Sequence, residues 1–517
     1  MGVSQFGIIV AMVAYLLGML TIGFKASRRN ETVDDFYLGG RHLGPFVTAM
    51  SAEASDMSSW LLMGLPGLAY LSGIAEPFWT ALGLAVGTYV NWLIVAKRLR
   101  RYSAAAGNAF TIPQFFSNRF GDKRHVLTLI SALVIVIFFI PYTASGFSAI
   151  GKLFSTLFNV DYHLAMIVGA LVVISYTMTG GFLAASITDL VQSIIMSFAL
   201  AIVLFFGANQ AGGWGAVMEN AKSLAGHISV TMSHIPDPAN LFAAGSTAPY
   251  GFLTIVSTLA WGLGYFGMPH ILLRFMAIED ERKLALSRRI ASIWVVIAMS
   301  VAILIGVIGL GMTKAGVIGE LTTSSASETV IVEIAHFLST FGFLPALVAG
   351  LILSGIMAST MSTADSQLLA ASSSVSQDIL GDFFGLKLND KQRLLIARLS
   401  LLVIAVVGVV IAWDSNSSVF RIVSFAWAGF GAAFGPLMLF SLFWRRVNFQ
   451  GALAGMVSGG AMIFIWKFLV RPLGGAFDIY ELLPAFLISS VVIVVVSLIT
   501  PAPEKEITDT FDKIAAM

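Results

Sequence analysis

Long apolar runs recur along almost the whole chain, and each is wide enough to cross a lipid bilayer. The runs are continuous rather than alternating, which favours membrane helices over the strands of a barrel. Thirteen spans are predicted, and they lie near residues 5–25, 45–71, 75–97, 125–155, 162–181, 187–207, 250–277, 289–313, 330–376, 394–413, 419–443, 450–470 and 480–500. The ninth is too long for one helix, so it is expected to include a surface stretch around 328–342. The pattern predicts an all-α integral membrane protein.

The composition agrees with a chain whose main solvent is lipid. Of the 517 residues, 57% are hydrophobic and 11% are charged, whereas soluble domains carry about 25% charged residues. The mean hydropathy is +0.88. The chain has no cysteine, which excludes disulfides, thiol catalysis and zinc–thiolate sites. No basic residue precedes the first span and no small-residue cleavage motif follows it, so a cleaved signal peptide is not expected.

Lysine and arginine are concentrated in the loops that follow the odd-numbered spans. These basic loops lie around 25–41, 97–124, 282–289, 387–398 and 445–446. Because cytoplasmic loops carry the excess of basic residues, the N-terminus is expected outside and the C-terminal tail in the cytoplasm. The longest loop, 208–249, is then external, and it is rich in Gly, Ser and Ala and nearly uncharged.

Two of the spans contain residues that interrupt helices. The second span reads GLPG at 64–67, and the seventh reads WGLGYFGMPH at 261–270. Because these spans are five apart, they cross the membrane in opposite directions. A matched pair of interrupted helices in antiparallel halves indicates an inverted-repeat secondary transporter with its site at the breaks. The alternative is that Gly and Pro are simply common in membrane helices.

Polar residues gather beside the first interruption, in EASDMSSWLLMGLPG at 53–67. A charge such as that of Asp56 costs about 2.5–3.5 kcal/mol at the bilayer centre by insertion scales, and Ser55, Ser58 and Ser59 accompany it. A set of ligands made only of oxygen suits a hard cation. The alternative is that Asp56 lies near the inner end of the span and only caps a helix.

The ninth span carries a second group of oxygen atoms in SGIMASTMSTADSQLL. Ser359, Ser362 and Ser366 are spaced by three and four residues, so they share one face of a helix. Thr363 and Asp365 flank that face. This density favours a binding role, although single hydroxyl groups in membrane helices usually bond to their own backbone or pack against a neighbour.

Four further kinds of residue leave two interpretations open. Asp189 begins the sixth span, where it is either a carboxylate favoured by the helix dipole or a cation ligand. Trp60, Trp261 and Tyr265 lie beside the two interruptions, where they form either an interfacial belt or the wall of a substrate cavity.

Arg274 is expected to be a positive-inside anchor rather than a ligand. The sequence contains no P-loop, GxSxG or HExxH motif, so an enzyme is the least favoured class.

The segments ASDMSSWLLMGLPG, WGLGYFGMPHILLRFMAI and MSTADSQLLAASSSVSQDIL closely resemble the sodium/solute symporter family, and its proline-carrying members in particular. The resemblance extends from TVDDFYLGGRHLG through YTMTGGFLAASITDLVQ to FGPLMLFSLFWRR. It implies alternating access by a core of two inverted five-span repeats. The implied division is 1–44 for a first span and its loop, 45–207 and 250–443 for the repeats, 208–249 for the external loop, 444–500 for two last spans and 501–517 for a cytoplasmic tail.

The resemblance also implies the binding residues. Sodium is expected at Ala54, Met57, Ser359, Ser362 and Thr363, with Asp56 in the neighbourhood. Proline is expected at Ser58, Trp60, Gly64, Trp261, Tyr265 and Pro269. Family members with two coupling ions suggest a possible second cation site at Asp189, Asp365 and Ser366, near Ser362. The chain departs from the proline-type pattern at Glu53, Ser59 and Asp365, where small residues are usual.

The expected function is sodium-coupled import of L-proline across a bacterial plasma membrane. Sodium is the coupling ion, the lipid bilayer is the surrounding phase, and no organic cofactor, nucleic acid or obligate protein partner is expected. Three alternatives remain open at this point: a symporter for another small amino acid or carboxylate, a membrane sensor built on a transporter fold, and a channel.

Overall fold

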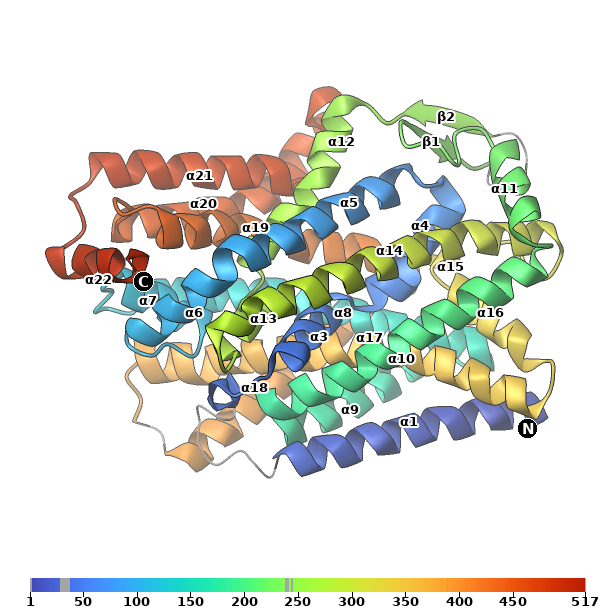
Figure 1. Cartoon of the computed structure of the whole chain (residues 1–517), viewed down its shortest axis with the longest axis horizontal. Coiled ribbons are helices and arrows are strands. Elements are labelled where there is room, and N and C mark those ends of the chain that lie inside the picture. Colours follow the sequence, from blue (N-terminus) through green and yellow to red (C-terminus); the bar gives the residue numbers. More distant parts are fainter. Residues whose placement is uncertain (1, 28–37, 238–240, 243–244, 388, 517) are drawn as a thin grey trace.

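Most helices of the protein run along its longest axis and lie side by side (Figure 1). The computed structural model describes residues 2–27, 38–237, 241–242, 245–387 and 389–516, so most of the predicted first basic loop lies outside the described residues. The α-helices are α1 Val3–Ser27, α3 Pro45–Asp56, α4 Leu65–Ser72, α5 Ala75–Val90, α6 Ala96–Ala105, α7 Ile112–Phe120, α8 Val126–Phe158, α9 Tyr162–Gly180, α10 Phe182–Gln210, α11 Trp214–Ser223, α12 Phe252–Leu259, α13 Pro269–Ala277, α14 Leu284–Lys314, α15 Ser324–Ser327, α16 Val330–Ser339, α17 Phe343–Ser373, α18 Asp390–Ile411, α19 Val419–Phe443, α20 Phe449–Ile465, α21 Leu482–Ile499 and α22 Lys505–Ala515. The 3₁₀- or π-helical segments are η1 Gly39–Arg41, η2 Trp60–Gly64, η3 Asn91–Val95, η4 Ala260–Gly267, η5 Glu281–Lys283, η6 Ser374–Phe383, η7 Trp466–Val470, η8 Arg471–Leu473 and η9 Gly475–Phe477.

Each of the thirteen predicted spans coincides with helical structure. Among the described residues, ten helices are long and apolar enough to cross a membrane, or eleven if the bent pair α12–η4 and α13 counts as one span. The second span is divided into shorter helices, and the apolar part of α9 that qualifies is only Tyr162–Ser175. The number thirteen therefore stays a prediction. Large apolar side chains such as Phe205 and Val410, each 66% exposed, point away from the core, as expected of a multi-pass membrane protein.

The ninth predicted span is two helices, as its length indicated. The short helix α16 ends before Gly342, which has φ 123°, and α17 begins at the next residue. α17 is a long, largely buried helix of 31 residues and packs against α1, α3, α8 and α10. α17 therefore contacts the first helix of the chain, α1, and three helices of the predicted first repeat, α3, α8 and α10.

The two interrupted spans pack in a reciprocal way. The first one places α4 against α14, and the second places η4 against α5 and α13 against α6. Glycine allows both approaches: a Cβ on Gly306 of α14 would lie 2.3 Å from the carbonyl oxygen of Pro66, and a Cβ on Gly87 of α5 would lie 2.3 Å from that of Gly262. Each interrupted span is thus held by the helix that follows the other one, which is the arrangement expected of two inverted repeats.

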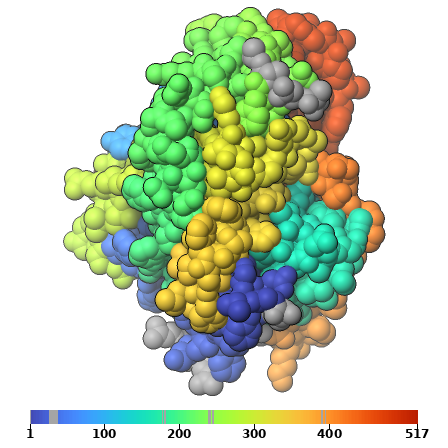
Figure 2. All heavy atoms as spheres, turned by 90° about the vertical axis from the view of Figure 1, so that its right-hand side faces the viewer, coloured from blue at the N-terminus to red at the C-terminus, as the bar shows by residue number. Residues whose placement is uncertain are grey.

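One end of the molecule is covered by the segments between the long helices. The predicted external loop contains α11 and a hairpin of β1 Met232–Ile235 and β2 Ser246–Pro249, paired antiparallel; the sequence did not predict this hairpin. Figure 2 shows this end, where that segment (green) lies beside the segment between α14 and α17 (yellow). The C-terminal helix α22 lies at the opposite end of the molecule (Figure 1).

Candidate functional site

The first interruption lies between α3 and η2. α3 ends at Asp56, and Met57 leaves the helical region with φ −74° and ψ 70°. The sequence placed the interruption at 64–67, and this position is wrong, because the backbone is helical from η2 directly into α4, and Gly64 and Leu65 both have right-handed helical φ and ψ. Gly64 instead permits close packing, since a Cβ there would lie 3.0 Å from the Cβ of Phe420.

Side chains from two other elements hold the backbone that this interruption frees. The carbonyl oxygen of Asp56 accepts hydrogen bonds from Trp60 Nε1 at 3.0 Å and from the hydroxyl of Tyr142 on α8 at 3.2 Å. Trp60 is 1% exposed. Buried backbone groups are costly when they have no partner, so these contacts explain how α3 can end inside the protein.

The second interruption has the position that the sequence predicted. The 3₁₀ segment η4 ends at Gly267, Met268 has φ −77° and ψ 108°, and the helices on either side are bent by 47°. The freed carbonyl of Trp261 accepts a hydrogen bond from Trp427 Nε1 at 2.8 Å. Pro269 begins α13, where proline is favoured.

The predicted sodium ligands from α3 and α17 meet. Ser362 Oγ donates to the carbonyl oxygen of Ala54 at 2.8 Å and also lies 3.2 Å from the carbonyl oxygen of Ser359. The hydroxyl of Thr363 is buried and has no hydrogen-bond partner among the described residues. Met57 is fully buried beside them at the end of α3. Backbone and hydroxyl oxygens from two distant segments thus converge, and such oxygens can coordinate an alkali cation.

Five of the six predicted substrate residues lie around the same place. The rings of Trp60 and Trp261 are 6.2 Å apart, and the hydroxyl of Tyr265 donates to Asp56 Oδ2 at 2.5 Å. Ser58 accepts a long hydrogen bond from the backbone of Trp60 at 3.4 Å, and Gly64 closes η2. The sixth residue, the proline that begins α13, follows the bend rather than the aromatic pair. This arrangement forms an aromatic wall next to the oxygen cluster.

Sequence reasoning missed several partners of this wall. Trp427, Phe420 and Tyr480 all contact the ring of Trp261, at centroid distances of 6.1, 5.3 and 5.3 Å. Tyr142 was also missed, and its only signal in the sequence is the preceding Pro141 in the middle of a span. The other three come from segments that carry no signal besides their aromatic character.

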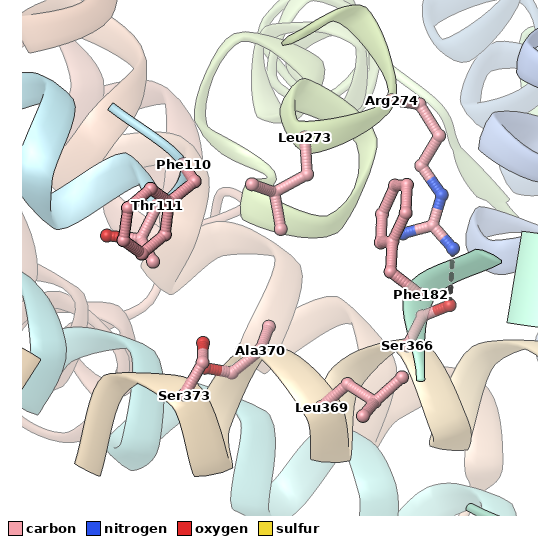
Figure 3. A pocket seen from close by; sticks show the side chains of 9 residues that line it. All are labelled: Phe110, Thr111, Phe182, Leu273, Arg274, Ser366, Leu369, Ala370 and Ser373. Atoms are coloured by element: carbon pink, nitrogen blue, oxygen red, sulfur yellow. Dashed lines mark hydrogen bonds between the residues drawn. The ribbon is translucent and has the colours of Figure 1, made fainter. Parts of the chain in front are cut away.

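The three residues of the possible second cation site also lie together, and an arginine joins them; Figure 3 shows its hydrogen bond to Ser366. The guanidinium of Arg274 contacts Asp189 Oδ2 at 3.1 Å and Ser366 Oγ at 2.6 Å. Ser366 Oγ in turn lies 3.4 Å from Asp365 Oδ1. Arg274 is 1% exposed, so the interpretation of this residue as a membrane-surface anchor is wrong.

Cavities adjoin the site at Arg274 and at Trp261. One of about 20 Å³ lies beside Arg274 and is bordered by Phe110, Phe182 and Leu369 (Figure 3). The other, of about 440 Å³, lies beyond Trp261 and is crossed by a bidentate ion pair between Arg421 and Glu76, with distances of 2.6 and 2.9 Å.

Two interrupted helices that enclose buried oxygens and aromatic rings define the class of secondary transporters built from inverted repeats. The comparisons make the assignment specific. The family model described as "Sodium:solute symporter family" matches residues 36–459, and the chain belongs to this family.

The chain is similar to relatives over almost its whole length. It is 44% identical to a sodium/proline symporter of Haemophilus influenzae, over 98% of this chain and 97% of the relative. It is 41% identical to the osmoregulated proline transporter OpuE of Bacillus subtilis, over 96% of each chain. A Na⁺-coupled sialic acid symporter, solved in a substrate-bound outward-open state, has a similar fold with a TM-score of 0.77 at 17% identity, over 96% of this chain and 99% of that one.

Proposed function

We propose that this protein is a sodium-coupled importer of L-proline that works by alternating access. The observation that carries the proposal is the contact between Ser362 Oγ and the carbonyl oxygen of Ala54, because it brings two predicted sodium-binding segments together beside the aromatic wall. Proline transporters at 39–44% identity over nearly the full length support the choice of substrate. The proposed location is the plasma membrane of a bacterium, with the N-terminus outside and the C-terminus in the cytoplasm.

The proposed sodium ligands are the backbone oxygens of Ala54, Met57 and Ser359 and the hydroxyl groups of Ser362 and Thr363. An ion held by these atoms links the end of α3 to α17. It therefore stabilises the interrupted helix in the shape that receives the substrate. By linkage, the substrate must raise the affinity for sodium by the same factor by which sodium raises the affinity for the substrate.

The proposed proline site lies against Trp60, Trp261 and Tyr265. The pyrrolidine ring is apolar and fits an aromatic wall, while Ser58 and the backbone freed at the interruption offer polar partners for the charged groups. The wall has few side-chain amides and acids, which a sugar would need. No catalytic or organic-cofactor role is proposed.

The cluster around Arg274 bears on the number of sodium ions. Asp189 and Asp365 carry two carboxylates, and the guanidinium supplies one permanent positive charge between them. We infer that the guanidinium of Arg274 supplies the positive charge that a second bound cation was predicted to supply at Asp189, Asp365 and Ser366. The small cavity beside it would lie on the cytoplasmic side under the proposed orientation, and the larger one beyond Trp261 on the external side.

Uptake of labelled L-proline into liposomes that contain the purified protein tests this proposal. Sodium, lithium and proton gradients are imposed one at a time. An inward sodium gradient should accelerate uptake above the level without sodium, and unlabelled proline should compete better than other small amino acids or carboxylates. Equal uptake in the absence of sodium would refute the coupling, and better competition by another compound would refute the substrate. Saturation of the flux would exclude the channel alternative.

A further inference from the structure

A second group of buried oxygens lies on the side of α3 whose side chains bond to η3 and η4 rather than to α17. Glu53 and Asp56 are three residues apart on α3, and Thr88 and Asn91 are three residues apart where α5 passes into η3, so each pair shares a helix face. Tyr265 of η4 joins the pairs, because its hydroxyl donates to Asp56 Oδ2 at 2.5 Å and its carbonyl oxygen accepts from Asn91 Nδ2 at 3.0 Å. We call these five residues the α3–α5 cluster.

The α3–α5 cluster contains more acceptor atoms than donors. Trp92 Nε1 donates to Glu53 Oε1 at 3.1 Å, but Glu53 Oε2, Asp56 Oδ1 and Asn91 Oδ1 have no hydrogen-bond partner among the described residues. The orientation of the Asn91 amide is fixed, since only its NH₂ group can serve the carbonyl of Tyr265. The Thr88 hydroxyl lies beside that of Tyr265 without forming a hydrogen bond of ordinary geometry.

The two carboxylates of the cluster have no protein cation. Both residues are at most 1% exposed, and neither forms an ion pair within the described part of the chain. Glu53 and Asp56 are close enough to repel each other electrostatically. The nearby buried arginine is bonded to Asp189 and Ser366 instead. Buried charges without a partner are strongly unfavourable, so each carboxyl group needs either a bound proton or a cation, and two neighbouring carboxylates with free oxygens can hold a cation.

We propose that Glu53, Asp56, Thr88 and Asn91 form a second sodium site, separate from the one between α3 and α17. All available ligands are oxygens, two of them from carboxylates, which suits a hard cation and gives no preference for zinc or copper. The carboxylate of Asp56 has its hydrogen-bond partner on η4, so it belongs to this cluster rather than to the ligands on α17. The proposal rests on the proposed function, and it adds that one chain binds two sodium ions.

The site connects sodium directly to the substrate wall. Tyr265 is one of the proposed proline-contacting residues, and both its hydroxyl and its carbonyl group bond to members of the cluster. An ion bound there fixes η4 against α3 and α5. It therefore orders the aromatic side chain before proline arrives, in the same way that the α17 site orders the other side of the interruption.

The test is the number of sodium ions that the full-length protein binds in detergent without proline, measured with ²²Na⁺. The wild type should bind two ions per chain. Glu53→Gln keeps the size of the side chain and an acceptor for Trp92 but removes the charge, and it should bind one ion, with an affinity for the remaining ion within about threefold of the wild type. Thr88→Val should bind two ions, one of them about tenfold more weakly, as expected from the loss of one ligand.

Thr80→Val is the matched control. Thr80 lies two turns earlier on α5, is equally buried and has a hydroxyl without a partner in the described structure, so its replacement should leave both ions bound. One ion per chain in the wild type, unchanged in Glu53→Gln, would overturn the second site and leave the proposed function intact. No sodium binding by a wild type that binds proline would contradict the proposed function as well.

Discussion

Arg274 provides the sharpest test of how charge is balanced in the interior. Its guanidinium donates to Ser51 Oγ at 3.0 Å, to the carbonyl oxygen of His270 at 2.8 Å, to Asp189 Oδ2 at 3.1 Å and to Ser366 Oγ at 2.6 Å. The group is almost completely buried. Arg274→Met would remove the charge and all four hydrogen bonds while keeping an apolar side chain of similar length.

The loss in the free energy of unfolding follows from the buried carboxylate that Arg274→Met leaves without its partner. Removing one partner of a buried ion pair typically costs about 3–5 kcal/mol, because the other charge stays buried without compensation. Asp189→Asn removes that charge. In the double variant with Arg274→Met, neutral groups replace this ion pair, and only the carboxylate of Asp365 loses its compensating charge, which is better tolerated than the loss at both carboxylates. We therefore expect Arg274→Met to lower the free energy of unfolding by about 3–5 kcal/mol, and the double variant to recover about 2 kcal/mol of that loss.

The assay is equilibrium unfolding of the purified variants in mixed micelles, analysed as a double-mutant cycle. Arg282→Met is the control, since Arg282 forms an exposed ion pair with Asp280 at 2.8 Å and its loss should leave stability unchanged. Effects of Arg274→Met and Asp189→Asn that simply add, within about 0.5 kcal/mol, would refute the reasoning.

Three further predictions concern single residues. Ser362→Ala should raise the sodium concentration for half-maximal proline uptake about tenfold, whereas Ser354→Ala, whose hydroxyl bonds only within its own helix, should leave it unchanged; equal effects would contradict the sodium site. Tyr265→Phe leaves Asp56 Oδ2 without its donor and should lower the free energy of unfolding by about 1–3 kcal/mol, and an unchanged unfolding curve would count against this contact. Burial lowers the pKa of His227, in the segment between α11 and β1, to about 4 from its ordinary 6.5. The neutral ring therefore stabilises that segment fully above pH 6.5, and the stabilisation, up to about 3 kcal/mol, is lost as the pH falls toward 4. The protection factors of amides in that segment, which are corrected for the slower intrinsic exchange at low pH, should fall between pH 7 and pH 5 in the wild type and change less in His227→Gln; identical pH responses would contradict this.

The interrupted helices could be predicted because glycine and proline signal them, but the first break lies several residues from its signal. Pro66 lies inside a helix that runs from η2 directly into α4, and Gly64 lies where α19 approaches, so neither residue marks the break. The break at 57–59 is held by Trp60 and Tyr142. A tertiary contact of this kind, from a helix about 80 residues away, leaves no local pattern in the sequence.

The candidate site was predictable to the extent that its residues share a helix face. The spacing of Ser359 and Ser362 on α17 could be read directly, and so could that of Glu53 and Asp56 on α3. The sequence does not show which helix packs against each of these faces. Arg274 looked like an anchor because basic residues at the ends of spans usually are, and only the fold shows that Asp189 reaches it.

Under the proposed function, a sodium ion between α3 and α17 and proline at the aromatic wall stabilise each other. Binding of labelled proline at several sodium concentrations, together with ²²Na⁺ binding at several proline concentrations, measures this coupling in both directions. The account predicts that each ligand increases the affinity for the other, by the same factor, and that this factor falls toward one in Ser362→Ala. Proline affinity that does not depend on sodium in the wild type would contradict it.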